Sequence, residues 1–233
     1  MNPKPKLIAA ATLLAALLPA SAATFDFANL QYNSSVNTGF LPTDGIACTG
    51  GDLCSSNVNG GIRNGDLTFT SGGITVAATA MFGNNVAAVV QDHENSFSAL
   101  NKIGAGLGVY HLTGDNSDDN ITVGETLVMT FSQVVHLTGI SLRSEGHNVT
   151  GWMQGSTFLL NGTNRSLPIG SGEIALDLTG TQFTLAYGGN WADQFYLSGM
   201  TAVAAVPEPE TYALMLAGLA AVGFVARRRR PAA

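Results

Sequence analysis

Apolar and polar side chains alternate with a period of two along most of the chain between residues 66 and 202. Alternation of this kind predicts β-strands with one buried face, because successive side chains of a strand point to opposite sides of the sheet. The clearest runs are 67–69, 74–78, 86–91, 127–131, 174–178, 183–187 and 194–202. Glycine and asparagine turns separate them, and no stretch of the body keeps a helical period. The pattern predicts an all-β, antiparallel β-sandwich that is jelly-roll-like.

The first 23 residues break this pattern. Lys4 and Lys6 precede an apolar run over 7–18, and small residues follow it. Such a tripartite segment is typical of a secretory signal peptide, with cleavage after Ala20-Ser21-Ala22 or after Ser21-Ala22-Ala23. We therefore expect residues 1–23 to be a signal peptide and the protein to be exported.

The last 27 residues also depart from the strand pattern. They consist of Pro207-Glu208-Pro209, an uncharged segment over 211–226, and a basic cluster of Arg227, Arg228, Arg229 and Arg230. As a helix, the uncharged segment would be roughly 24 Å long. It could cross a hydrocarbon core of about 30 Å if the arginines snorkel to the headgroups. The pattern predicts a single transmembrane helix whose arginine end lies in the cytoplasm.

Between the two ends lies a body of residues 24–206, which has the length of one domain. It contains 4 Lys and Arg against 14 Asp and Glu, so its net charge is −10, whereas the whole chain carries −6. This acidic balance excludes nucleic acid as a partner. The two cysteines of the chain, Cys48 and Cys54, are predicted to form a small-loop disulfide, as suits an exported protein.

The tail resembles the PEP-CTERM sorting signal of Gram-negative bacteria, on the three parts quoted above in their order. The middle of the chain also resembles the β-sandwich domains of many such proteins, on residues 106–109, 115–120, 124–131, 135–138 and 192–197. The resemblance implies recognition by an exosortase, a membrane-embedded cysteine protease-transpeptidase. It implies processing near Pro207-Glu208-Pro209 and transfer to the cell surface or extracellular matrix. The chain would then be the substrate of that enzyme and would supply no catalytic residue.

One acidic stretch could bind a metal. Asp115, Asp118 and Asp119 lie in a single loop, with Glu125 as a less favoured fourth candidate. Hard oxygen ligands suit calcium, although the spacing is not that of an EF-hand. The alternative is a solvated turn, because aspartate and asparagine are ordinary turn residues.

Four aromatic residues could stack on sugar rings: Trp152, Trp191, Tyr187 and Tyr196. The alternative is that they fill the core, which is the commoner place for large aromatics. No G-x-S-x-G elbow occurs. A glycoside hydrolase needs only two well-placed carboxylates, which the 14 acidic residues of the body could supply. The sequence favours a non-enzymatic structural or adhesive surface protein over a carbohydrate-binding module, and either over a hydrolase.

Overall fold

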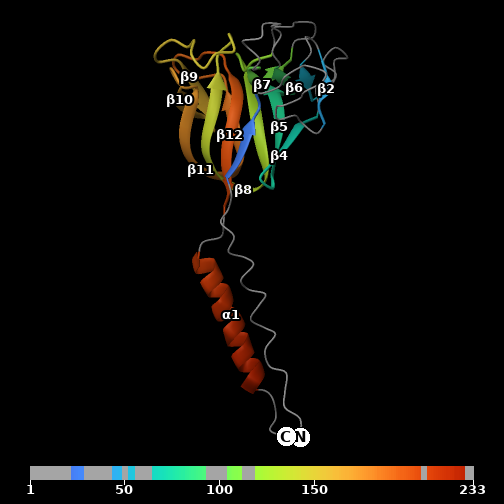
Figure 1. Cartoon of the computed structure of the whole chain (residues 1–233), viewed down its shortest axis with the longest axis vertical. Helices are drawn as coiled ribbons and strands as arrows, with labels where there is room; N and C mark the ends of the chain where they lie inside the picture. Colours follow the sequence, from blue (N-terminus) through green and yellow to red (C-terminus); the bar gives the residue numbers. More distant parts are fainter. Residues whose placement is uncertain are drawn as a thin grey trace.

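The computed structural model describes residues 22–28, 44–48, 52–55, 65–92, 104–111, 119–205 and 209–228, and the body is built from strands (Figure 1). The strands are β1 (Ala22–Asp26), β2 (Ile46–Ala47), β3 (Leu53–Cys54), β4 (Leu67–Ser71), β5 (Ile74–Phe82), β6 (Asn85–Asp92), β7 (Gly106–Tyr110), β8 (Glu125–Arg143), β9 (Thr157–Leu160), β10 (Thr163–Ser166), β11 (Glu173–Ala186) and β12 (Tyr196–Ala204). One helix, α1 (Pro209–Arg228), follows. The all-β, antiparallel prediction is confirmed, since every pairing between these strands is antiparallel.

The strands form one hydrogen-bonded network instead of the two separate sheets of the predicted jelly-roll-like sandwich. The order is β1-β12-β7-β6-β5-β8-β11-β9-β10, and an additional pairing of β12 with β8 closes a ring through β12, β7, β6, β5 and β8. The closing strand is β8, which has 19 residues. Its first half pairs with β5 and its second half with β12, while β11 follows both halves on its other side.

The change of partner along β8 coincides with three successive exposed residues, 132–134. Before them, Leu127, Met129 and Phe131 are buried on one face, as the period of two predicts. After them, register shifts against β11 and β12 allow the strand to turn toward new neighbours. The sequence pattern identified the buried face of the first half but not the length of the strand.

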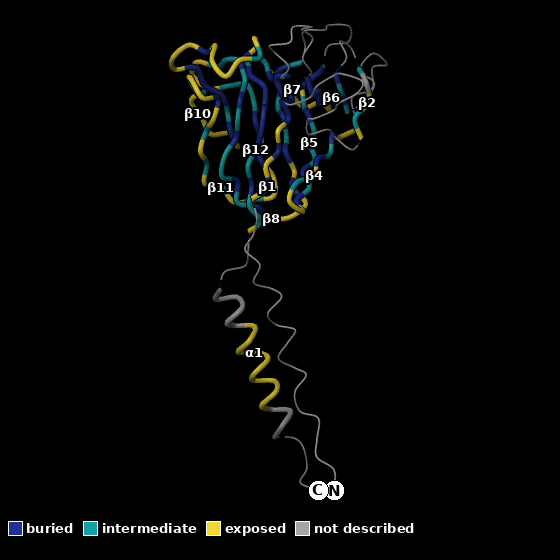
Figure 2. The backbone as a smooth tube through the Cα atoms, viewed as in Figure 1, coloured by how far each residue is buried: buried dark blue, intermediate teal, exposed yellow. Residues whose placement is uncertain are grey.

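Phenylalanine side chains occupy the centre of the core. Figure 2 colours the buried backbone dark blue, and strands β6, β7 and β12 are mostly buried. Phe27 packs edge-on against Phe69 at 4.8 Å between ring centroids, and Phe131 packs edge-on against Phe183 at 5.8 Å. Edge-to-face contacts of this kind add to the stabilisation from burial of the rings. These ring contacts therefore join the segment just after β1 to β4, and β8 to its neighbour β11.

Strand β1 begins at the predicted signal-peptide boundary, although residues 1–21 lie outside the described residues. Ala22 pairs with Val203 and Ala23 pairs with Ala202, so the first strand lies beside the last one. Ala23 is 1% exposed and belongs to the core.

We expect signal peptidase to cut after Ala22, so that the exported protein begins at Ala23. Cleavage after Ala23 would remove a buried side chain from β1 and one pair from its register. Mass spectrometry of the N-terminal peptide of the exported protein checks this. A mature chain beginning at Thr24 would contradict the expectation, as would one that retains residues before Ala23.

Helix α1 covers the uncharged segment of the tail, and its described side chains, 215–224, are exposed. Within the part of the chain that the structure describes, no helix meets the length and apolarity needed to cross a membrane. The predicted transmembrane span is therefore not shown. Pro207 and Glu208 lie outside the described residues, as do Arg229 and Arg230.

Candidate functional site

Three aspartates from distant parts of the sequence meet near the end of β6. One carboxylate oxygen each of Asp52, Asp92 and Asp119 lies within 4.8 Å of the other two. Asp52 and Asp92 are buried, and Asp119 is half-buried. We call these three residues the carboxylate cluster.

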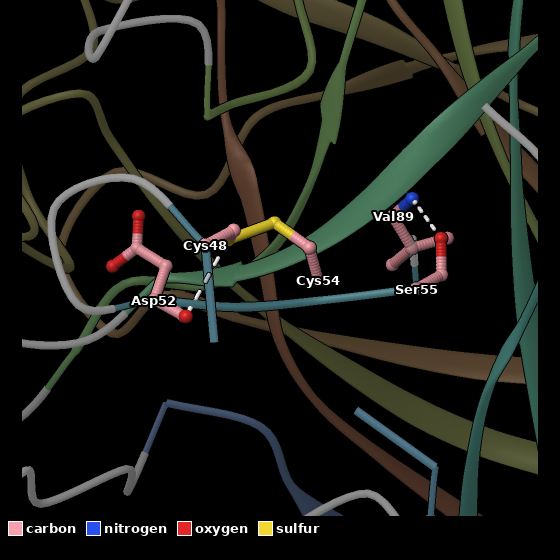
Figure 3. Close-up of a disulfide and its surroundings, with 5 residues drawn as sticks. All are labelled: Cys48, Asp52, Cys54, Ser55 and Val89. Carbon is pink, nitrogen blue, oxygen red and sulfur yellow. Dashed lines mark hydrogen bonds between the residues drawn. A yellow bond between two sulfur atoms is a disulfide. The ribbon is translucent and has the colours of Figure 1, made fainter. Parts of the chain in front are cut away.

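The disulfide between Cys48 and Cys54 fixes the first member of the cluster (Figure 3). Within the closed loop, the Cys48 N–H donates to the Asp52 carbonyl at 3.0 Å, and the carboxylate of Asp52 points away from the sulfur atoms. Leu53 pairs with Gln91 across β3 and β6. Because the pairing is antiparallel, the residue before Leu53 lies beside the residue after Gln91, which brings Asp52 to Asp92.

Asp119, the third member of the cluster, is positioned by a close approach of its backbone to that of β7. Val109 N–H donates to the Asn120 carbonyl at 3.0 Å, so the segment of Asp119 lies along β7. A Cβ atom on Gly108 would lie 1.7 Å from the Asp119 carbonyl oxygen. Only glycine lets the chain pass at this distance, and Gly108 therefore sets the position of Asp119.

Several polar groups contact the cluster. The Ala105 N–H donates to Oδ2 of Asp92 at 2.9 Å, and Nε2 of His147 lies 3.4 Å from the same oxygen. The Tyr196 hydroxyl donates to Oδ1 of Asp119 at 2.5 Å. Burial raises the pKa of Tyr196 far above its usual value, and the negative charges of Asp119, Asp92 and Glu145 act in the same direction. The hydroxyl therefore stays protonated and remains a donor.

The donor set and spacing of the cluster fit a calcium ion. Calcium takes carboxylate oxygens at about 2.3–2.6 Å, so two ligands on opposite sides of one ion are about 5 Å apart. Oxygens that lie within 4.8 Å of one another can therefore all reach a single ion. Three carboxylates would supply about half of the 6–8 oxygens that calcium takes.

The cluster only partly coincides with the sequence-predicted calcium loop. Asp119 belongs to both, whereas Asp115 and Asp118 lie outside the described residues. Glu125 does not join the cluster: its buried carboxylate lies 2.7 Å from Nδ1 of His111 and accepts from the Thr122 N–H at 2.7 Å. Asp52 and Asp92 were missed because their approach depends on strand register and on the disulfide.

The four aromatic candidates for sugar stacking lie in different environments. Trp152 is 7% exposed and its indole N–H donates to the Gln194 carbonyl, so its ring faces are packed. Tyr196 is buried, and the Tyr187 hydroxyl donates to the Ala192 carbonyl. Trp191 is 69% exposed. The structure therefore does not bring the two tryptophans together on one open face.

The described chain combines an antiparallel β body with a C-terminal helix that ends in arginines, an arrangement that fits an exported protein with a C-terminal sorting signal. Residues 205–230 match the family model of the PEP-CTERM protein-sorting motif. The chain thus carries the PEP-CTERM motif, which marks proteins that are exported in Gram-negative bacteria and processed by an exosortase. No curated protein and no solved structure matches the chain.

Proposed function

We propose that this protein is a non-enzymatic structural or adhesive component of the cell surface or extracellular matrix. The observation that carries the proposal is the PEP-CTERM motif at residues 205–230. Exosortase acts near Pro207-Glu208-Pro209, and the body between the signal peptide and the tail remains at the surface or in the matrix. The N-terminal signal peptide provides the route out of the cytoplasm.

The acidic groups of the body favour a binding or structural role over hydrolysis. The carboxylate cluster is largely buried. None of its members lines either of two surface depressions, which lie over strands β1, β12, β8 and β11. A glycoside hydrolase needs an acid and a second carboxylate that flank a bound substrate. The largely buried carboxylates of the cluster can stabilise the fold but cannot reach the glycosidic bond of a bound substrate.

Fractionation of the exporting cell tests the proposed role. An antibody against the body is expected to detect the protein in the surface or extracellular fraction, with a mass lower than that of the full chain by the signal peptide and the tail. Accumulation of the full-length chain in the cytoplasm would contradict export. Hydrolysis of a polysaccharide by the purified protein would contradict the non-enzymatic role.

We also propose a structural calcium ion at the carboxylate cluster. Calcium at 100 times its Kd is expected to stabilise the folded protein by about 2.7 kcal/mol. For a domain of this size, that raises Tm by about 5–11 °C over a sample in EDTA. Differential scanning calorimetry of the exported protein measures the shift.

The Asp52→Asn variant separates a bound ion from a general salt effect. It removes one negative ligand and is expected to lose most of the calcium-dependent rise in Tm. The control is Asp66→Asn, because Asp66 is exposed and lies outside the cluster. An equal calcium response in all three proteins would contradict the proposed ion.

A carbohydrate-binding module is the second candidate function. Trp191 supports it, since an indole with 69% exposure offers a face for stacking on a sugar ring. Replacement of Trp191 by alanine tests this candidate, and unchanged glycan retention would exclude Trp191 as its platform.

A further inference from the structure

A shallow groove crosses the outer face of four neighbouring strands, β1, β12, β8 and β11. Two rows of paired residues form its floor, and both follow from the register. One row is Asp26, Gly199, Ser141 and Glu173, and the other is Thr24, Thr201, Gly139 and Ala175. Most of these side chains are absent or short, so the face is hollow where larger residues would fill it.

Two adjoining depressions occupy this face. Their volumes are about 290 Å³ and 280 Å³, and both are lined by Ser141, Glu173 and Thr201. Together they run across the strands from Asp26 on β1 to Ala175 on β11. Each depression alone is slightly smaller than the usual pocket for a drug-sized molecule. This groove instead suits a narrow polar ligand that lies across the strands.

Carboxylates and hydroxyls provide hydrogen-bonding groups along the groove. Asp26 and Glu173 are exposed carboxylates at its two sides. The hydroxyls of Ser141 and Thr201 lie on the strands between them, and that of Thr24 lies beside Asp26 on β1. Each hydroxyl can donate and accept. A ligand with many hydroxyl groups can therefore form hydrogen bonds with the hydroxyls of the floor and with the carboxylates at both sides.

Arg143 lines one end of the groove. One of its terminal N–H groups donates to the His147 carbonyl at 2.8 Å, while its buried Nε–H has no acceptor among the described residues. Burial lowers the pKa of Arg143, and the nearby charge of Asp26 opposes this effect. A guanidinium has five N–H donors, so donors remain for a ligand oxygen.

We propose that this groove binds a neutral polysaccharide chain, which goes beyond the proposed surface role by naming a partner for it. An anionic chain is disfavoured because two carboxylates face one guanidinium in the groove and the body carries a net charge of −10. Apolar residues such as Val149 and Ile174 also line the depressions, but hydroxyl and charged residues occupy the paired rows, so a purely apolar partner is disfavoured. A neutral glycan offers the donors and acceptors that both sides require.

The wide spacing of the strands that carry the two acids favours binding over hydrolysis. Asp26 and Glu173 are separated by β12 and β8, which amounts to three inter-strand spacings. Each spacing is about 4.8 Å, so the two backbones are about 14 Å apart. Glycoside hydrolases place their carboxyl pair about 5–9.5 Å apart.

Affinity electrophoresis of the exported protein in gels that contain dextran, laminarin, galactomannan or alginate tests the groove. We expect retardation in at least one neutral polysaccharide and none in alginate. Ala175→Trp places a large side chain on the floor and is expected to weaken retardation at least tenfold. Thr179→Trp is the matched control, because Thr179 is exposed on the same strand but lines neither depression.

Two further variants locate the contact and separate it from misfolding. Glu173→Gln keeps the shape of the side chain but removes its charge, and we expect binding to weaken by about tenfold, since hydrogen bonds to charged groups are the stronger ones. A Tm equal to that of the parent protein shows that each variant is folded. Three results would overturn the proposed groove. They are no retardation in any neutral polysaccharide, stronger retardation in alginate, and retardation lost in Trp191→Ala but kept in Ala175→Trp. Concentration-dependent dimerisation abolished by Ala175→Trp would also overturn it, with a second copy as the occupant. None of these results changes surface delivery, which is measured separately.

Discussion

Replacement of Arg227, Arg228, Arg229 and Arg230 by alanine is expected to stop maturation of the protein and leave the tail attached. These arginines belong to the segment that matches the sorting motif. A basic residue near an anionic membrane surface contributes about 1 kcal/mol, so removal of four weakens the orientation of the tail by about 4 kcal/mol. That corresponds to roughly a thousandfold change in an equilibrium constant. Immunoblotting of surface and cell fractions measures the ratio of processed to unprocessed chain.

A variant with four lysines in place of the arginines is the matched control for charge. It is expected to mature like the parent protein if charge at the end of the tail is what matters. Arg165→Ala controls for the loss of an arginine elsewhere, because Arg165 is exposed on β10. Normal surface delivery of the alanine variant would contradict the function of the tail as a sorting signal.

Replacement of Gly108 by alanine is expected to produce the largest loss of stability from a single added methyl group. The new Cβ would lie 1.7 Å from the Asp119 carbonyl oxygen and 2.8 Å from the Asn120 Cα. Both neighbours are backbone atoms, so the strand and the adjacent segment must separate. Overpacking costs typically 1–3 kcal/mol, and we expect about 3 kcal/mol or more here. This lowers Tm by about 6–12 °C, measured by circular dichroism.

Gly139→Ala is the matched control for this substitution. A Cβ on Gly139 would meet its nearest atom, the Ile174 carbonyl oxygen, at the ordinary distance of 3.5 Å. Its Tm is therefore expected to stay within about 2 °C of the parent value, since such surface changes are usually within 0.5 kcal/mol. Equal Tm values for the two variants would contradict the close approach at Gly108. Gly108→Ala is also expected to remove the calcium-dependent rise in Tm, because the Asp119 carboxylate moves with its displaced backbone.

The period of two predicted the strands well because it depends only on which side chains face the core. Leu127, Met129 and Phe131 are buried together, as are Phe183 and Leu185. The closure of the ring could not be predicted in this way. It depends on β8 changing partner along its length, and partner choice is a long-range property that alternation does not encode.

The tail could be predicted from sequence alone, because its proline turn, apolar segment and arginine cluster are contiguous. The carboxylate cluster could not. Asp52 is brought to Asp92 by the disulfide and by the register of β3 on β6, and the sequence separation of 40 residues hides that contact. The groove was also missed, because it is defined by short side chains that align only when four strands are paired.

The pairing of β1 with β12 also constrains the order of events during export. β12 is the last strand before the tail and pairs with β1, β7 and β8, so the ring cannot close until residue 204 has crossed the membrane. Until then the translocating chain lacks β12, and the body remains incompletely folded. We therefore expect completion of the fold to coincide with arrival of the sorting signal at the membrane, so that the exosortase meets a substrate that has only just become able to fold.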